Sequence, residues 1–263
     1  MLNITRFPGR PSNVSNFFRE IENLFFFIRF ELNFTSIMNV NVLRVLVAIL
    51  CLVGSVGYGQ AMIYAIGKFL RVPNTLMWLG LGAASYILLY LSYFSRREKF
   101  WSVFEHELTH ALFAILFFRK VHAFEVKRGA GGSVKIDSNN FIVGLSPYFF
   151  PLLAVPIVLI KPSFSFQHQA VFNGLLGYTL MFHLVHLVKE FHPQQPDIKK
   201  HGMLFSIVVL LFFNLFFIGL AIASLGGNWN DMSYFLRLGY YESILFVKKT
   251  WHIFYQQSVG KYT

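Results

Sequence analysis

The chain has 263 residues, of which 55% are hydrophobic, 13% are charged and 32 are phenylalanine, with a formal net charge of +11 at pH 7. This composition excludes a water-soluble globular protein and indicates a membrane protein, because so apolar a chain would aggregate in water. The basic residues mostly flank apolar runs, which favours the lipid bilayer as a partner and argues against nucleic acid. The single cysteine, Cys51, excludes an internal disulfide framework and is expected to be a small packing residue.

Residues 1–41 are predicted to be an N-terminal extension. A turn-rich segment, PGRPSNVSN, precedes FFREIENLFFFIRFELNF, which mixes charged and aromatic residues as an amphipathic helix on a membrane surface does. Met38 begins MNVNVLRVLVAIL, a sequence typical of the start of a membrane protein. The residues before Met38 can therefore equally be an upstream extension without function.

Six apolar stretches are long enough to cross a bilayer, and they predict an all-α polytopic membrane domain over residues 42–225. They lie at about 45–67, 75–94, 101–118, 141–160, 170–188 and 203–225. The first contains Gly54, Gly57 and Gly59, which would allow close packing against another helix. Residues 226–263 are predicted to be an amphipathic C-terminal tail that rests on the lipid headgroups.

The third apolar stretch contains a polar cluster, FEHELTHALF. On a helix, His106 and His110 lie on one face one turn apart, where their imidazoles can share a metal ion. Glu107 is placed to reach a water on that metal without binding the metal itself, so the segment is a match to the H-E-x-x-H zinc signature. Each ionisable side chain in a membrane span costs about 2.5–3.5 kcal/mol, and a metal in a water-filled pocket would offset that cost. The alternative is a polar helix face that lines a channel or packs on a partner.

A catalytic zinc site needs a third protein ligand, and the candidates lie in residues 181–202. They are His183, His186, Glu190, His192, Asp197 and His201. Asp197 is favoured, because it follows a proline at a helix break where the chain can turn inward. The alternative for Asp197 is an ordinary carboxylate in an interfacial loop. His183 and His186 can line the pocket or hydrogen-bond another helix, and we expect the second.

Residues 121–137 alternate on either side of a glycine-rich turn and predict a small β-hairpin directly after the metal-binding helix. Its free edge, at Gly131, Gly132 and Val134, could bind an extended peptide, although a plain connector would have the same pattern. The following stretch, 141–160, is expected to be irregular, because it carries three prolines: Pro147, Pro151 and Pro156.

These motifs, in this order, resemble the site-2 protease family of intramembrane zinc metalloproteases, in particular its compact bacterial branch without PDZ domains. The resemblance covers about residues 101–206, and HELTHAL matches the family's zinc helix closely. The second motif departs from the usual Asn-Pro followed by Asp-Gly. Here Asp197 is followed by Ile198, and the next glycine is Gly202.

The resemblance implies a function and a site. His106, His110 and Asp197 would bind one Zn²⁺ ion, and Glu107 would activate water. The catalytic core would be the third to fifth apolar stretches, within the bacterial inner membrane and near its cytosolic face. The substrate would be a single-span membrane protein, cut within its transmembrane segment.

Three other functions fit parts of the pattern. A non-catalytic zinc-binding membrane protein could use the same fold to bind or sequester membrane partners. A metal transporter would need further acids or histidines, and the first, second, fourth and sixth stretches contain none. A prenyl-protein protease would take a glutamate as third ligand, and Glu190 is the candidate for that role.

Overall fold

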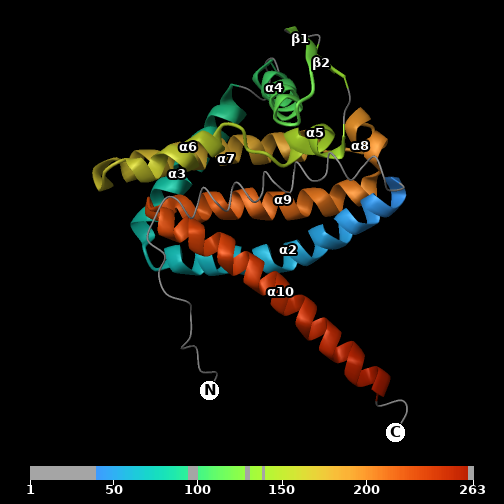
Figure 1. Cartoon of the computed structure of the whole chain (residues 1–263). Coiled ribbons are helices and arrows are strands. Elements are labelled where there is room, and N and C mark those ends of the chain that lie inside the picture. The colour runs from blue at the N-terminus through green and yellow to red at the C-terminus, as the bar shows by residue number, and fades with distance from the viewer. Residues whose placement is uncertain (1–39, 94–99, 128–130, 138–139, 260–263) are drawn as a thin grey trace.

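The computed structural model describes residues 40–93, 100–127, 131–137 and 140–259, so the predicted N-terminal extension lies outside it apart from its last two residues. The helices are α2 (Val40–Leu70), α3 (Pro73–Ser92), α4 (Phe100–Leu116), α5 (Phe141–Leu145), α6 (Ala154–Ile160), α7 (Gln169–Glu190), α8 (Pro196–His201), α9 (Met203–Ala223) and α10 (Trp229–Val259). The strands are β1 (Val121–Lys127) and β2 (Gly131–Ile136) (Figure 1).

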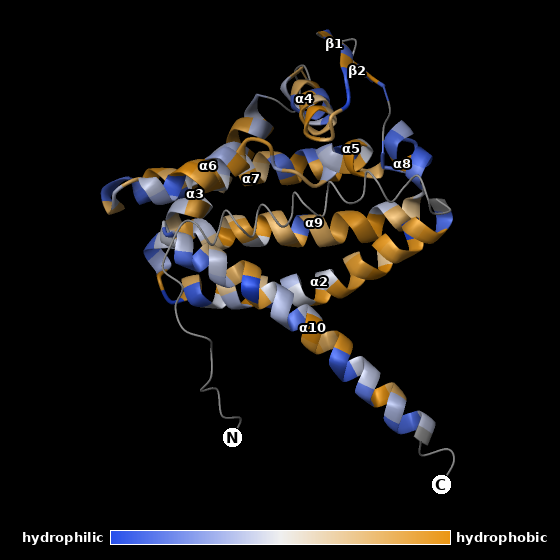
Figure 2. Cartoon of the chain, in the orientation of Figure 1, coloured by the Kyte–Doolittle hydropathy of each residue, from blue (hydrophilic) through white to orange (hydrophobic). Residues whose placement is uncertain are grey.

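Within the described ranges, four helical segments are long and apolar enough to cross a membrane. They are Asn41–Leu70, Pro73–Ser92, Phe166–Glu190 and Met203–Gly226, which correspond to the first, second, fifth and sixth predicted stretches. The chain thus has the helices of a membrane protein, and in Figure 2 the most apolar of them, α9, is coloured mostly as hydrophobic.

The other two predicted spans are not confirmed as spanning helices. α4 has 17 residues, fewer than the roughly 20 that a bilayer requires. The 141–160 stretch is broken into α5, a 3-10 turn at Ser146–Tyr148 and α6. Proline lacks a backbone N–H and cannot continue a helix ladder, which explains the breaks and confirms the expected irregularity.

The long helices pack in pairs, α3 along α7, α2 along α9 and the first part of α10 along α2 (Figure 1). Glycine lets the α3 and α7 backbones touch. A Cβ atom on Gly82 would lie 1.8 Å from the Gly174 carbonyl oxygen, and one on Gly177 would lie 1.9 Å from the Leu79 carbonyl oxygen. Close backbone approach through small residues is how helices associate where lipid removes the hydrophobic driving force.

The predicted role of the α2 glycines holds for two of the three. A Cβ atom on Gly54 would lie 2.4 Å from the Phe212 ring, and one on Gly57 would lie 2.3 Å from the Gly239 carbonyl oxygen. Gly59 has only an ordinary contact, 3.9 Å from Leu215. Cys51 on the same helix is buried, as expected of a packing residue.

Two hydrophobic cores occupy opposite ends of the bundle. One lies beneath α4 and gathers residues of α4, α5, α8 and α9, including Phe113, Val143 and Ile198. The other joins α2, α6, α7 and α9 to the start of α10, through Met232 and Phe235. α10 thus begins as part of the packed bundle. Its distal part leaves the bundle and alternates between polar and apolar residues, as Figures 1 and 2 show.

The predicted β-hairpin is confirmed. β1 and β2 pair antiparallel, with Phe124 opposite Val134 and Val126 opposite Gly132. Both strands pack against α4, so the hairpin lies beside the helix that carries the H-E-x-x-H motif.

Candidate metal centre

α4 presents the two motif histidines on one face. His106 and His110 are one turn apart, their ring centroids are 4.9 Å apart, and their Nε2 atoms are 3.2 Å apart. The α4 helix places both rings above the core that it shares with α5 and α8. The helical spacing read from the sequence therefore brings both imidazoles to one point.

α8 brings a carboxylate to the same point. Pro196 occupies the first turn of α8, and Asp197 follows it. A backbone N–H at that position would have no partner within the helix, so the missing N–H of proline costs no hydrogen bond. Buried Ile198 anchors α8 in the core beneath α4. Asp197 Oδ2 lies 3.4 Å from His110 Nε2 and 3.7 Å from His106 Nε2. Gly202 ends α8 with φ +90°, a value that favours glycine.

The three side chains form a set that could hold a metal ion. Each of His106, His110 and Asp197 offers one ligand atom, and these atoms all lie within 4.8 Å of one another. Among the histidines, cysteines and acids of the described ranges, this set has the geometry of a metal site.

The far nitrogen of each imidazole is held by a fixed acceptor. His110 Nδ1 donates to the Val143 carbonyl oxygen at 2.8 Å, and His106 Nδ1 donates to Glu190 Oε2 at 2.9 Å. The Ser102 hydroxyl donates to the other Glu190 oxygen. A neutral imidazole that donates from Nδ1 carries a lone pair on Nε2. Both Nε2 lone pairs therefore face the Asp197 carboxylate, and a cation among the three would relieve their repulsion.

Asp197 is held in its ionised form. Burial by itself raises the pKa of its carboxyl group, but when the imidazoles of His106 and His110 are protonated, their Nε2–H groups donate to the carboxylate and hold that pKa below its usual range. An ionised carboxylate is the form that binds a metal ion.

Glu107 lies beside the triad without belonging to it. Its side chain is half-buried and rests on β2, where a Cβ atom on Gly132 would lie 2.7 Å from Glu107 Cγ. The backbone of Val134, on the same strand, interacts with the Glu107 carboxylate. Two of the three predicted edge residues thus contact Glu107. The third, Gly131, has φ +85° and open space where a Cβ would be.

The remaining candidates from the sequence, His201 among them, lie outside the triad. Glu190, the rival third ligand, meets the Nδ1 side of His106 and not the side where the triad converges. His183 Nε2 lies 3.2 Å from Asn214 Oδ1 on α9, and His186 Nε2 lies 3.1 Å from the Tyr86 hydroxyl on α3. The expectation that these two histidines hydrogen-bond other helices is confirmed. Neither they nor His192 join the triad.

Two groups that contact the histidines were not predicted from the sequence. The Val143 carbonyl is a backbone group and leaves no sequence signal. Tyr148 packs edge-on against His106, with ring centroids 5.3 Å apart, and it lies in the proline-broken segment. The prolines predict that the segment bends but not which side chain the bend delivers to His106.

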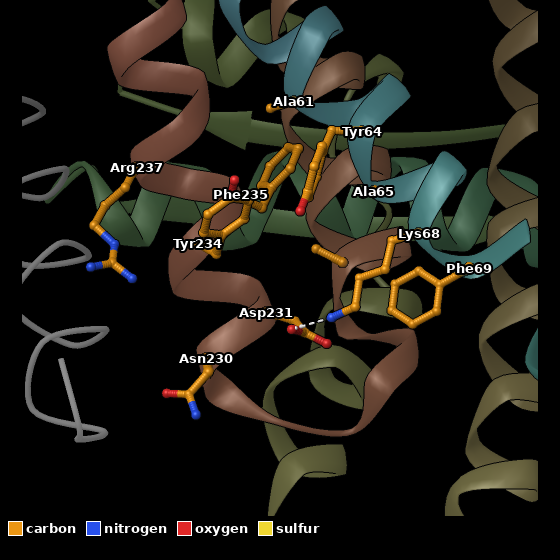
Figure 3. Close-up of a pocket in the computed structure, with 11 residues that line it drawn as sticks. Ala61, Tyr64, Ala65, Lys68, Phe69, Asn230, Asp231, Tyr234, Phe235 and Arg237 are labelled. Atoms are coloured by element: carbon orange, nitrogen blue, oxygen red, sulfur yellow. Dashed lines mark hydrogen bonds and ion pairs between the residues drawn. The ribbon is translucent and has the colours of Figure 1, made fainter. Parts of the chain in front are cut away.

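A cavity of about 260 Å³ lies between α2 and α10, away from the triad and near the core that includes Met232 (Figure 3). It contains the Lys68–Asp231 ion pair at 2.5 Å and the neighbouring rings of Tyr64 and Tyr234, 5.2 Å apart. Asp231 is its single acid, so its lining lacks a set of metal ligands.

Comparison of the chain with protein-family models, with curated proteins and with solved structures gave no match. The function therefore has to be inferred from the chemistry of the triad and its neighbours.

Proposed function

We propose that this protein is an intramembrane zinc metalloendopeptidase that cleaves transmembrane segments of membrane-anchored proteins. His106, His110 and Asp197 are the zinc ligands, and Glu107 is the general base. The observation that carries the proposal is the convergence of three acceptor atoms, in which the outer nitrogen of each imidazole is held by a fixed acceptor.

The donor set suits zinc. Tetrahedral ligands with bonds of about 2.0–2.1 Å lie about 3.3 Å from one another. The three distances within the triad are 3.2, 3.4 and 3.7 Å. Two imidazoles and one carboxylate are typical of catalytic zinc sites, in which three protein ligands leave one position for water or substrate.

Each residue has a defined task in peptide hydrolysis. Bound zinc would polarise water and the scissile carbonyl group. Glu107 takes a proton from the attacking water and passes it to the leaving amine. Glu190 and the Val143 carbonyl keep the imidazoles in the tautomer and orientation that the ligands need. Gly132 leaves room for Glu107 because it has no side chain.

The membrane setting determines the substrate. A transmembrane helix satisfies its peptide groups internally, so it must unwind before a peptide bond can be attacked. The β2 edge at Gly131, Gly132 and Val134 lies beside Glu107 and can pair with the unwound strand. By resemblance to site-2 proteases, the substrate is a single-span protein of the bacterial inner membrane, cut near the cytosolic face.

The test replaces the base without changing the metal ligands. Glu107→Gln should retain one zinc per chain and lower cleavage of a co-expressed transmembrane reporter by at least about 100-fold, because general base catalysis is lost. Glu125→Gln, an exposed acid on β1, is the matched control and should cleave normally. Zinc is measured by elemental analysis and cleavage by immunoblot.

Normal cleavage by Glu107→Gln would refute the role of Glu107. If the unaltered protein bound zinc but cleaved no tested segment, the alternative of a non-catalytic zinc protein that sequesters membrane partners would replace the protease.

A further inference from the structure

The cavity between α2 and α10 is lined by two cations, Lys68 and Arg237, and by one acid, Asp231. Both oxygens of that acid already have partners. Asp231 Oδ1 pairs with Lys68 Nζ at 2.5 Å, and Oδ2 accepts a hydrogen bond from Asn228 Nδ2 at 3.0 Å. Lys68 balances the charge of Asp231, so the charge of Arg237 is left over in the lining.

Three hydrogen-bond donors lie on one face at the start of α10. Asn230, Tyr234 and Arg237 follow one another at spacings of four and three residues, which brings an amide, a phenol and a guanidinium to the same side of the helix. All three line the cavity. Asn230 is exposed and Arg237 is partly exposed, so a ligand outside the bundle can reach both.

Arg237 has donors to spare. Its Nε donates to the Ser233 carbonyl oxygen at 3.2 Å, and no acid of the described ranges forms an ion pair with it. In Figure 3 the guanidinium points back toward Asn230 and the start of α10. A guanidinium binds phosphate oxygens through pairs of N–H groups, so this side chain is suited to a phosphate group.

The cavity lies where membrane-spanning segments end. Lys68 is close to the end of the span Asn41–Leu70, and α10 begins shortly after the span Met203–Gly226. Ends of spans lie at the depth of the lipid headgroups. Tyr64, one turn deeper on α2, lines the cavity and is 52% exposed, so it would contact acyl chains.

We propose that this cavity binds the headgroup of an anionic phospholipid, with phosphatidylglycerol as the probe. Arg237 and Asn230 donate to phosphate oxygens, Lys68 adds positive charge, and the acyl chains run along α2 beside Tyr64. Phosphatidylcholine has the same phosphate, but its quaternary ammonium group cancels the charge and would meet the two cations. The inference depends neither on zinc nor on cleavage.

The experiment measures lipid binding to the whole chain. Delipidated protein in detergent is titrated with dioleoyl-phosphatidylglycerol or with dioleoyl-phosphatidylcholine, and native mass spectrometry counts the bound lipid. The first phosphatidylglycerol should bind about tenfold more tightly than the first phosphatidylcholine, as charge-assisted hydrogen bonds predict.

Two variants test the assigned donors. Arg237→Gln should lower the preference for phosphatidylglycerol to about threefold or less, because the charge-assisted bonds become neutral ones. Asn230→Leu should weaken the binding of both lipids about threefold, because both offer a phosphate to the lost donor. Asn230 is exposed, so this variant serves if Arg237→Gln fails to fold. Arg71→Gln is the matched control. It removes an exposed arginine beyond the same end of α2, outside the cavity lining, and should leave both affinities unchanged.

Equal binding of the two lipids overturns the site. An equal loss of preference in Arg71→Gln and Arg237→Gln would also overturn it, because the attraction would then belong to the whole basic face. Inorganic phosphate, which has the headgroup chemistry without acyl chains, should not displace the lipid. Displacement by phosphate would identify a site for a free anion and refute the lipid assignment.

Discussion

Two carboxylates compete for the same histidine, and their positions assign them different tasks. Asp197 Oδ2 faces the Nε2 atoms of both imidazoles, whereas Glu190 accepts the Nδ1 hydrogen of His106 alone. A metal ligand and a residue that orients a ligand respond differently to neutral replacement. The difference can be measured.

Asp197→Ala should lose zinc, because two imidazoles alone make a weak site. Glu190→Gln should keep zinc with an affinity lower by about 10- to 100-fold, the usual effect of changing a group that orients a ligand. Competition with a zinc chelator gives both values. Stoichiometric tight zinc in Asp197→Ala together with its loss in Glu190→Gln would reverse the two roles.

At the scale of elements, the pairing of α3 with α7 positions the end of α7 that carries Glu190. The contact depends on glycines that leave no room for a side chain, as the 1.8 Å distance from a Cβ on Gly82 to the Gly174 oxygen shows. Gly80, on the same helix, has nothing within 4 Å of such a Cβ. Comparing an alanine substitution at Gly82 with one at Gly80 therefore separates the effect of packing on stability from the effect of helix propensity.

Gly82→Ala should destabilise the protein by about 1–3 kcal/mol, because overpacking forces the two backbones apart. Gly80→Ala should be neutral or slightly stabilising, because alanine favours the helix. Unfolding midpoints in detergent give both values. Equal midpoints for the two variants would show that α3 and α7 do not depend on this close approach.

At the scale of the whole molecule, the helices place their functional groups at one end. α8 and the hairpin both meet α4 at the triad, while buried Lys161 donates to the Ser224 carbonyl oxygen at 2.8 Å at the other end. α7 joins the two ends, and its 22 residues extend about 33 Å, close to the thickness of the hydrocarbon layer.

Cysteine labelling should find the two ends on opposite sides of the membrane. In a Cys51→Ala background, Lys135→Cys on the hairpin and Lys199→Cys on α8 should react with an impermeant maleimide from the same side. Phe166→Cys should react from the other side, because Phe166 is 91% exposed between α6 and α7. Labelling of all three from one side would contradict the arrangement.

Local patterns in the sequence predicted much of this molecule. The spacing of His106 and His110 predicted their common helix face, because helical periodicity depends only on neighbours along the chain. The glycine-rich turn predicted the hairpin, and the prolines predicted the break within 141–160. The same stretch was also counted as a span, because hydropathy registers composition and not helix continuity.

Contacts between distant segments needed the tertiary structure. The sequence favoured Asp197 and left Glu190 and His192 as alternatives, since each lies more than 70 residues from His110 and no local pattern shows which of them the fold brings to the histidines. Packing of Ile198 beneath α4 placed Asp197 at the Nε2 atoms, and packing of α3 on α7 placed Glu190 behind His106. The chemistry at this point follows from residue type and helical spacing, whereas the role of each distant carboxylate follows from which helices fit together without a gap.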